Sequence, residues 1–310
     1  MNAAVKEYPL ELAVRGFTSL LQRAPRRSAL ATASALATAY GLFDPYHKKI
    51  ARTNLRIAFP ELNEHEREHL AMESYRNLAR VAVEVARLPL LSPSNIHQLV
   101  RYDPVLGLEN YIAAKSGNRG VLYLTGHFSC WELLPYAHAL YGYPLSFLVR
   151  PLDNRRIETW MDRRRCGSGN RTIPKKNSTR PILSTLARGG DVGILIDQNV
   201  MANEGSFIPF FGKLACTTTG LARLALKTGA PVVPGRIQWQ PEARIYHIQF
   251  LPALKIPETG DFERDVLAVT RLFNEVVEQM IRMDPSAWLW GHRRWQTRPP
   301  EDPRNPYANS

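Results

Sequence analysis

The fold of this chain is decided by residues 120–132, GVLYLTGHFSCWE. The apolar run Gly120 to Leu124 predicts a short buried strand, and the pattern after it predicts a helix. His127 falls between the two, at a strand-to-helix turn. Because open α/β sheets bind their substrates at the carboxyl ends of strands, the sequence predicts a functional site at this turn.

Downstream of this strand, apolar runs alternate with helical patterns. We expect strands at 120–124, 145–149, 192–196, 232–237 and 244–250, and helices from Ser129, from Asp153 or Asn154, from Ser178, over 218–227 and over 262–280. Strands that alternate with helices predict an α/β fold, in which a mixed, mostly parallel sheet is flanked by helices on both faces. An antiparallel pair near the end makes the sheet mixed.

The first ninety residues have the pattern of helices with clear start signals. Asp44 precedes Pro45, and Asn63 precedes Glu66 by three positions, as at capped helix N-termini. We expect a helical segment at 1–90 that packs over the sheet or faces a membrane, an α/β domain at 91–298, and a loose Pro-rich tail at 299–310.

His127 and Glu132 supply an imidazole and a carboxylate within one turn. Residues five apart on one helix point about 140° apart, so one of the two must precede the helix. Ser129 and Glu132 have the spacing of a capping box, which predicts a helix that begins after Ser129, with Glu132 leaning back toward His127. Such a carboxylate orients the ring and leaves its second nitrogen free to take a proton from a hydroxyl. The alternative is that Glu132 only caps and His127 only packs.

The composition favours an anionic partner. The 310 residues carry a net charge of +12 with a sequence pI near 9.8, which suits a membrane surface, a phosphorylated substrate, an acidic carrier protein or nucleic acid. Between Arg150 and Arg188, eleven Lys or Arg residues face three acids. This stretch is either an anion site, with Arg150, Arg164 and Arg165 as its best candidates, or a solvated basic face. The three cysteines lack zinc-site or disulfide spacing.

Three later segments offer further candidates. They are Asp197-Gln198-Asn199 at the end of a strand, the apolar loop Phe207-Ile208-Pro209-Phe210-Phe211-Gly212, and Thr217-Thr218-Thr219 at a helix start. Asp197 would bind Mg²⁺, orient an arginine or cap its loop. The apolar loop would line a channel for a hydrocarbon chain or belong to the core. The threonines would open a helix whose free N–H groups receive an anion.

In this order, these blocks resemble the bacterial lipid A biosynthesis acyltransferase family of lauroyl and myristoyl transferases, within the lysophospholipid and glycerolipid acyltransferase superfamily. The similarity runs from about Arg15 to Pro299. It rests on HxxxxE at 127–132, RPxDN at 150–154, DQ at 197–198, FIPFFG at 207–212, TTTG at 217–220, APVVP at 230–234 and WxWxHRRW at 288–295.

The resemblance implies transfer of a fatty acyl chain from an acyl carrier protein or coenzyme A thioester to a hydroxyl of a membrane lipid, such as a lipid A precursor. His127 would be the general base and Glu132 its orienting partner, with no covalent intermediate, cofactor or metal. The implied substrate-binding residues are Arg150, Arg164, Arg165, Asp197, Gln198, Phe207, Pro209, Phe210, Gly212, Thr217 and Thr218.

The expected location is the cytoplasmic face of a bacterial inner membrane, at an anionic surface, with peripheral or weak attachment. The 16 residues from Ser28 to Phe43 are uncharged, but a membrane span needs about 20 strongly apolar residues.

Several alternatives remain at this stage. In one alternative, the enzyme acylates another glycolipid or a lysophospholipid. In a second, the protein is a non-catalytic basic binder of nucleic acid or membranes, with nucleic acid the less expected partner. A metal hydrolase using His127, Glu132 and Asp197 is a third class. GxSxG, GxxxxGK[ST], GxGxxG and HExxH motifs do not occur, which disfavours the enzyme classes that depend on them.

Overall fold

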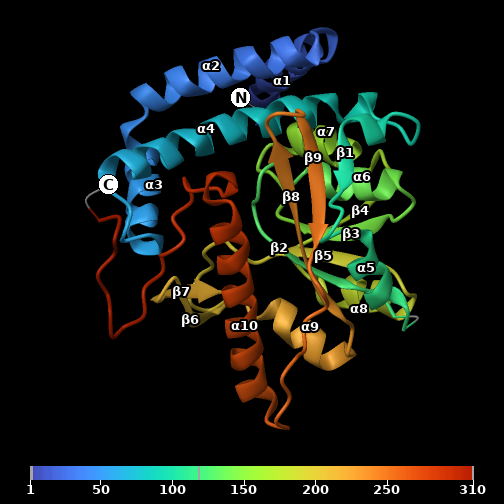
Figure 1. The fold of residues 1–310 in the computed structure, drawn as a ribbon, viewed down its shortest axis with the longest axis vertical. Coiled ribbons are helices and arrows are strands. Elements are labelled where there is room, and N and C mark those ends of the chain that lie inside the picture. Colours follow the sequence, from blue (N-terminus) through green and yellow to red (C-terminus); the bar gives the residue numbers. More distant parts are fainter. Residues whose placement is uncertain (1–2, 118, 309–310) are drawn as a thin grey trace.

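A mostly parallel sheet forms the centre of the computed structural model, which describes residues 3–117 and 119–308 (Figure 1). Within these residues the sheet has seven strands in the order β1-β9-β8-β2-β5-β3-β4, and only the β8–β9 pair is antiparallel. Its strands are β1 (Val100–Tyr102), β2 (Leu122–Thr125), β3 (Leu145–Val149), β4 (Arg171–Pro174), β5 (Asp191–Leu195), β8 (Val232–Gln240) and β9 (Ile245–Phe250). The predicted fold class is confirmed.

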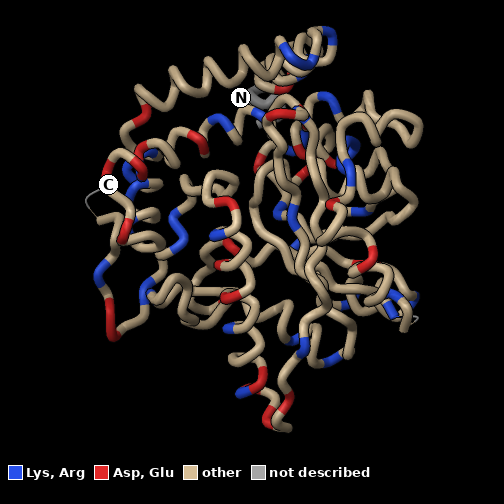
Figure 2. Tube along the Cα trace, viewed as in Figure 1, with Lys and Arg blue, Asp and Glu red and all other residues tan. Residues whose placement is uncertain are grey.

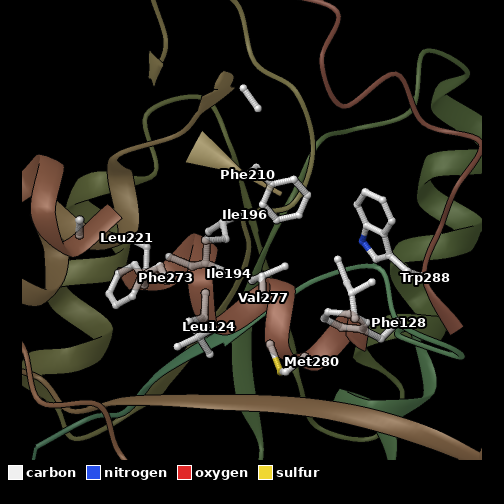
Figure 3. Packing of buried hydrophobic residues seen from close by; sticks show 14 of the residues in the cluster. Leu124, Phe128, Ile194, Ile196, Phe210, Leu221, Phe273, Val277, Met280 and Trp288 are labelled. Atoms are coloured by element: carbon white, nitrogen blue, oxygen red, sulfur yellow. The ribbon is translucent and has the colours of Figure 1, made fainter. Parts of the chain in front are cut away.

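Helices cover both faces of this sheet, as the buried strand β2 requires. Leu122 and Leu124 point into one core cluster and Val121 and Tyr123 into the other, because side chains alternate along a strand. The first cluster is closed by α8 (Thr179–Ala187), α9 (Gly220–Thr228) and α10 (Phe262–Met283), and the second by α5 (Leu108–Lys115), α6 (Leu133–Leu140) and α7 (Arg155–Cys166). Figure 3 shows the α10 stripe with Phe273, Val277 and Met280 beside Leu124.

The N-terminal part is helical, as predicted. It comprises α1 (Ala3–Arg23), α2 (Arg26–Phe43), α3 (Pro45–Ala58) and α4 (Glu64–Arg87), followed by short 3₁₀ turns at Leu88–Leu90 and Ile96–Gln98. Asn63 and Glu66 form the expected capping box, and the Asp44 side chain caps α3. Helix α2 runs alongside α4 at the top of Figure 1, and Val81 and Val85 of α4 reach the core under α6. Across the described ranges, every helix is either too short or too polar to cross a bilayer.

The expected apolar loop at 207–212 is a hairpin instead. Strands β6 (Ser206–Phe210) and β7 (Lys213–Thr217) pair antiparallel, and Phe211 and Gly212 between them both have positive φ, which suits a tight two-residue turn. Phe210 is fully buried and packs on Trp288 and Trp295. An apolar run of this length does not by itself distinguish a loop from a strand.

The prediction of a loose C-terminal tail is wrong for the described residues. After a 3₁₀ turn at Pro285–Ala287, the three tryptophans Trp288, Trp290 and Trp295 are buried, as expected for tight docking. Tyr307 is also buried; its hydroxyl donates to Asn54 Oδ1 at 2.5 Å and accepts from the Trp295 backbone at 3.1 Å. The buried Tyr307 side chain therefore anchors a segment whose proline content predicted a loose tail. Residues 309–310 lie outside the described part.

Replacing Tyr307 by Phe should destabilise the protein by about 1–3 kcal/mol, because Asn54 Oδ1 and the Trp295 N–H then lose a buried partner. Urea unfolding followed by tryptophan fluorescence measures this change. Tyr46→Phe is the matched control, since Tyr46 is 44% exposed, and it should stay within about 0.5 kcal/mol of the parent. Equal stabilities of the two variants would mean that the C-terminal segment is not anchored in this way.

Candidate active site

His127 and Asp197 form the centre of the site. Strands β2 and β5 are parallel neighbours with Thr125 opposite Leu195, so the residues two positions beyond each strand end come together. His127 Nδ1 lies 2.8 Å from Asp197 Oδ1, and the His127 backbone N–H donates to Oδ2 at 2.8 Å. The Trp288 indole N–H donates to the same Oδ2, also at 2.8 Å. The two strand ends that the sequence placed at one edge thus share a hydrogen-bonded pair.

The predicted capping box at Ser129 and Glu132 is wrong. Helix α6 begins only at Leu133, and Ser129 has a φ of +46°, outside the helical region. The reason is tertiary: the Ser129 backbone N–H donates to the Ala287 carbonyl at 2.7 Å, and Phe128 bridges to Trp288. Pairing of Phe128 and Ser129 with the C-terminal segment, together with the left-handed backbone of Ser129, delays the start of the helix.

Glu132 faces an arginine, not the imidazole. Arg165 Nε donates to Glu132 Oε2 at 2.9 Å and Arg165 Nη2 to Oε1 at 2.5 Å, a bidentate pair at the partly buried end of α7. Within the described residues, His127 is hydrogen-bonded to Asp197 and Gln198. The expectation that Glu132 orients the ring is therefore corrected: Asp197 does so.

The electrostatics of the pair make His127 more basic than usual. Burial lowers the pKa of His127, but the Asp197 carboxylate and its hydrogen bond outweigh burial and raise the pKa above its ordinary 6.5, with a smaller contribution from Glu132. Burial alone would raise the pKa of Asp197, yet His127 and Trp288 hold it at about 2. Asp197 is thus ionised at neutral pH and accepts from Nδ1–H, which leaves Nε2 of the neutral ring as its basic nitrogen, within 3.2 Å of the Gln198 amide nitrogen.

A cavity of about 570 Å³ opens at His127. One part is polar and cationic, with Arg150, Arg165, Lys175, Gln198, Asn199 and Thr218 on its wall. The other part extends over the sheet and is apolar, with Tyr123, Leu145, Phe147, Gly193, Ile194, Gly235 and Phe250 on its wall. Gln198 Nε2 lies 3.2 Å from His127 Nε2, and both residues are on the cavity wall. The cavity therefore accommodates a ligand with a polar group at the imidazole and an apolar chain beyond it.

Some predicted residues lie elsewhere. Arg164 stacks on Trp160, with its guanidinium carbon 3.6 Å from the ring centre, so Arg165 is the arginine of this helix at the cavity. Thr217 is fully buried, and its hydroxyl accepts a hydrogen bond from Arg294 Nη2 at 2.6 Å. The predicted chain-binding residues of the hairpin, Phe207, Pro209, Phe210 and Gly212, are not on the cavity wall. Helix α9 starts at Gly220, after its N-cap Thr219.

Sequence reasoning missed several residues of the site. Lys175 follows β4 and lay within the basic stretch, where nothing distinguished it from its neighbours. Trp131 places its ring edge-on to His127, 5.0 Å between centres. His292 accepts from the Asn199 backbone at 2.9 Å, and burial lowers the pKa of His292 to about 4. The contact between His292 and Asn199 joins segments far apart in sequence and leaves no local pattern.

The metal-ligand set considered from the sequence is not assembled. Throughout residues 3–117 and 119–308, no three His, Cys, Asp or Glu side chains gather closely enough to hold a metal ion. Glu132, one of the three candidates, is instead paired with Arg165.

Comparison with known proteins identifies the family of the chain. Residues 3–297 match the family described as bacterial lipid A biosynthesis acyltransferase. The chain is 29% identical over 253 residues to the lipid A biosynthesis palmitoleoyltransferase of Escherichia coli (strain K12), covering 81% of this chain and 79% of that protein. It is 28% identical over 252 residues to the lauroyltransferase of the same strain, with the same coverage, and 24% identical over 253 residues to its myristoyltransferase, covering 82% and 76%.

The α/β fold and this match define the protein as an O-acyltransferase. More specifically, the chain belongs to the bacterial lipid A biosynthesis acyltransferase family. The resemblance noted from the motifs is thereby confirmed.

The two carboxylates near His127 can be told apart by titration. Asp197→Asn should bring the pKa of His127 below 6.5, because burial, which lowers it, is then no longer opposed. Glu132→Gln should lower it much less, since Glu132 is committed to Arg165. NMR of the His127 ring against pH measures both, and a larger shift for Glu132→Gln would contradict the assignment.

The same pair makes stability depend on pH. The raised pKa of His127 contributes stability that is complete below about pH 6.5 and is lost as the pH rises through the folded-state pKa. The free energy of unfolding should therefore be higher in mildly acidic than in mildly alkaline solution, and Asp197→Asn should reduce this difference. Urea unfolding at each pH measures it. An unchanged difference would argue against a charged pair.

Proposed function

We propose that this protein transfers a fatty acyl chain from an acyl thioester, carried by acyl carrier protein or coenzyme A, to a hydroxyl of a membrane lipid acceptor such as a lipid A precursor, with His127 as the general base. The observation that carries the proposal is the hydrogen-bonded Asp197–His127 pair, whose imidazole is on the wall of one cavity lined by both cationic and apolar side chains. Family membership supports the acceptor class, since the similar E. coli proteins are named as lipid A biosynthesis transferases.

In this mechanism, His127 Nε2 accepts the hydroxyl proton while the oxygen attacks the thioester carbonyl. The carbon–sulfur bond then breaks, the imidazolium returns the proton to the leaving thiolate, and the products are an ester and a free thiol. Asp197 keeps the ring in the required tautomer and stabilises the imidazolium. Because its own pKa is held at about 2, it carries the compensating negative charge throughout. No cofactor takes part in this scheme.

The polar part of the cavity suits anionic groups of the substrates. Arg150 and Lys175 line it, and Arg165 is fixed there by Glu132. Arg165 Nη1 is buried without a hydrogen-bond partner among the described residues. Since an unpaired buried N–H is costly, we assign it to an anionic oxygen of a substrate, and we assign Glu132 to positioning Arg165.

The apolar part of the cavity suits the transferred acyl chain. Glycines at 193 and 235 leave its floor open between Phe147 and Phe250. A chain lying there has its thioester carbonyl near His127 and its carrier on the cationic side. An acidic carrier protein or the phosphates of coenzyme A would be attracted to that side.

The proposed location is the cytoplasmic face of the inner membrane, with peripheral attachment. Helices α1 and α2 support it, because α1 exposes the large apolar side chains of Phe17 and Leu20 close in sequence to the exposed Arg23 and Arg27, and the end of α2 exposes Phe43. Apolar side chains beside arginines are typical of helices at an anionic lipid surface.

His127→Ala should reduce acyl transfer by about 10²–10⁴-fold, the usual contribution of a positioned general base. The assay follows release of the free thiol together with mass spectrometry of the lipid product. His65→Ala is the control, since His65 is exposed on α4. Unchanged turnover in a folded His127→Ala protein would exclude the mechanism and leave a non-catalytic lipid or nucleic-acid binder as the better reading.

Gly193→Ala should be tolerated by the fold but should shorten the acyl chains that the enzyme uses. An added Cβ lies at ordinary contact distance from Phe147 Cβ, at 3.5 Å, and from Leu145 Cδ1, at 3.6 Å, so it narrows the apolar part. Turnover of a thioester series should fall first for the longest chain. Gly16→Ala, with open space around its Cβ, is the control, and an identical chain-length profile would place the acyl chain elsewhere.

A further inference from the structure

A second cavity of about 610 Å³ lies between helices α2, α3 and α4 and the segment 289–292. Its wall consists of Leu36, Ala37, Tyr40, Asp44, His47, Ala51, Ala71, Ser74, Tyr75, Leu78, Ala79, Leu289, Gly291 and His292. The mechanism above uses none of its side chains. Its size falls within the range of sites for small or chain-like ligands.

The polar groups of this cavity are already engaged by the protein. Asp44 accepts from the His47 backbone and lies 2.8 Å from His47 Nδ1, and the Tyr75 hydroxyl donates to it at 3.2 Å. Ser74 donates to the Trp288 carbonyl, and His292 Nε2 accepts from the Asn199 backbone. These side chains leave little for a polar ligand to satisfy, so the cavity suits an apolar one.

The second cavity adjoins the catalytic one. Leu78 and Leu289 are on the walls of both cavities. The His292–Asn199 hydrogen bond joins a residue of one wall to a residue of the other. A ligand with its reacting group at His127 therefore has two apolar spaces within reach, one over the sheet and one under α2.

The second cavity is bordered by an apolar surface. Leu36 and Tyr40 of α2 line it while remaining 59% and 60% exposed, and Leu42 and Phe43 continue the exposed apolar surface toward the end of the helix. Figure 2 shows α2 without charged positions between the arginines at its start and Asp44 at its end. A hydrocarbon chain can thus pass between a bilayer at α2 and this cavity without crossing a charged surface.

We infer that this second cavity binds a hydrocarbon chain of the acceptor lipid while the acceptor hydroxyl lies at His127. The inference rests on the proposed function. The occupant is the acceptor and not the acyl donor, because a thioester with an anionic carrier fits the cationic side at Arg150 and Lys175, and its chain fits the space beside Phe147 and Gly193. The acceptor is held in a bilayer and arrives from the side of the exposed apolar α2.

Photolabelling with the full-length wild-type protein tests this arrangement without requiring turnover. A lipid A precursor with a diazirine at a chain terminus, presented in anionic phospholipid vesicles, should label residues of α2 and α4 around the second cavity. An acyl thioester with a terminal diazirine should instead label β3 and β5. Labelling of the second cavity by the thioester, or by neither probe, would overturn the inference.

Ala37→Trp gives an independent kinetic test. Ala37 is a partly buried residue of the cavity wall, so an indole there should occupy the space and raise the KM for the lipid A precursor about tenfold, with the KM for the thioester unchanged. Ala39→Trp, at an exposed position two residues further along α2, is the matched control and should keep both values. Circular dichroism verifies that each variant is folded.

The outcomes separate the two proposals. If wild-type protein turns over no thioester and lipid pair, the proposed function fails, whereas photolabelling of the second cavity by the lipid still supports chain binding there. If turnover is normal but Ala37→Trp changes donor chain-length preference or nothing at all, the acceptor-chain site is wrong and the proposed function stands.

Discussion

A buried carboxylate beside a partly buried imidazole is the constraint on which the rest of this structure depends. Asp197 is almost completely enclosed, and an ionised group in that position is costly unless hydrogen bonds and an opposite charge compensate it. Here the His127 backbone and ring and the Trp288 indole all donate to it. His127 follows β2, Asp197 follows β5 and Trp288 is in the C-terminal segment, so the pair forms only when these three segments are in place together. Leaving one partner alone in this site would be strongly destabilising.

The C-terminal segment therefore has a structural part in the site. Its tryptophans fill the space between the sheet and α4, and Asn77 of α4 donates to both the Ser129 and Ala287 carbonyls. Arg294, fully buried, donates to the Cys216 carbonyl and the Thr217 hydroxyl. Through these contacts the N-terminal helices, the hairpin and the strand ends fix one another. The same segment supplies Leu289 and His292, which separate the catalytic cavity from the apolar cavity under α2.

The histidine and the carboxylate of the HxxxxE block have different partners. His127 pairs with Asp197, and Glu132 pairs with Arg165. The block therefore supplies two side chains with separate partners: His127, whose ring Asp197 orients, and Glu132, which holds the guanidinium of Arg165. Arg165 Nη1 is buried without a hydrogen-bond partner among the described residues. Between the two side chains the backbone turns at Ser129, which has a φ of +46° and donates its N–H to the Ala287 carbonyl.

The sequence by itself determined five of the seven strands of the main sheet, most of the helices and the edge at which the site lies. Apolar periodicity, Asn63 with its capping glutamate and the strand ends before His127 and Asp197 are local signals. Only the tertiary structure decided which carboxylate serves the histidine, why Ser129 leaves the helix, that residues 207–217 form a hairpin and that Tyr307 is anchored. Each of these depends on a contact with a distant segment, such as Ala287 for Ser129 and Asn54 for Tyr307. Such a contact leaves no periodic trace in either segment, and it outweighs local preferences of about 1 kcal/mol.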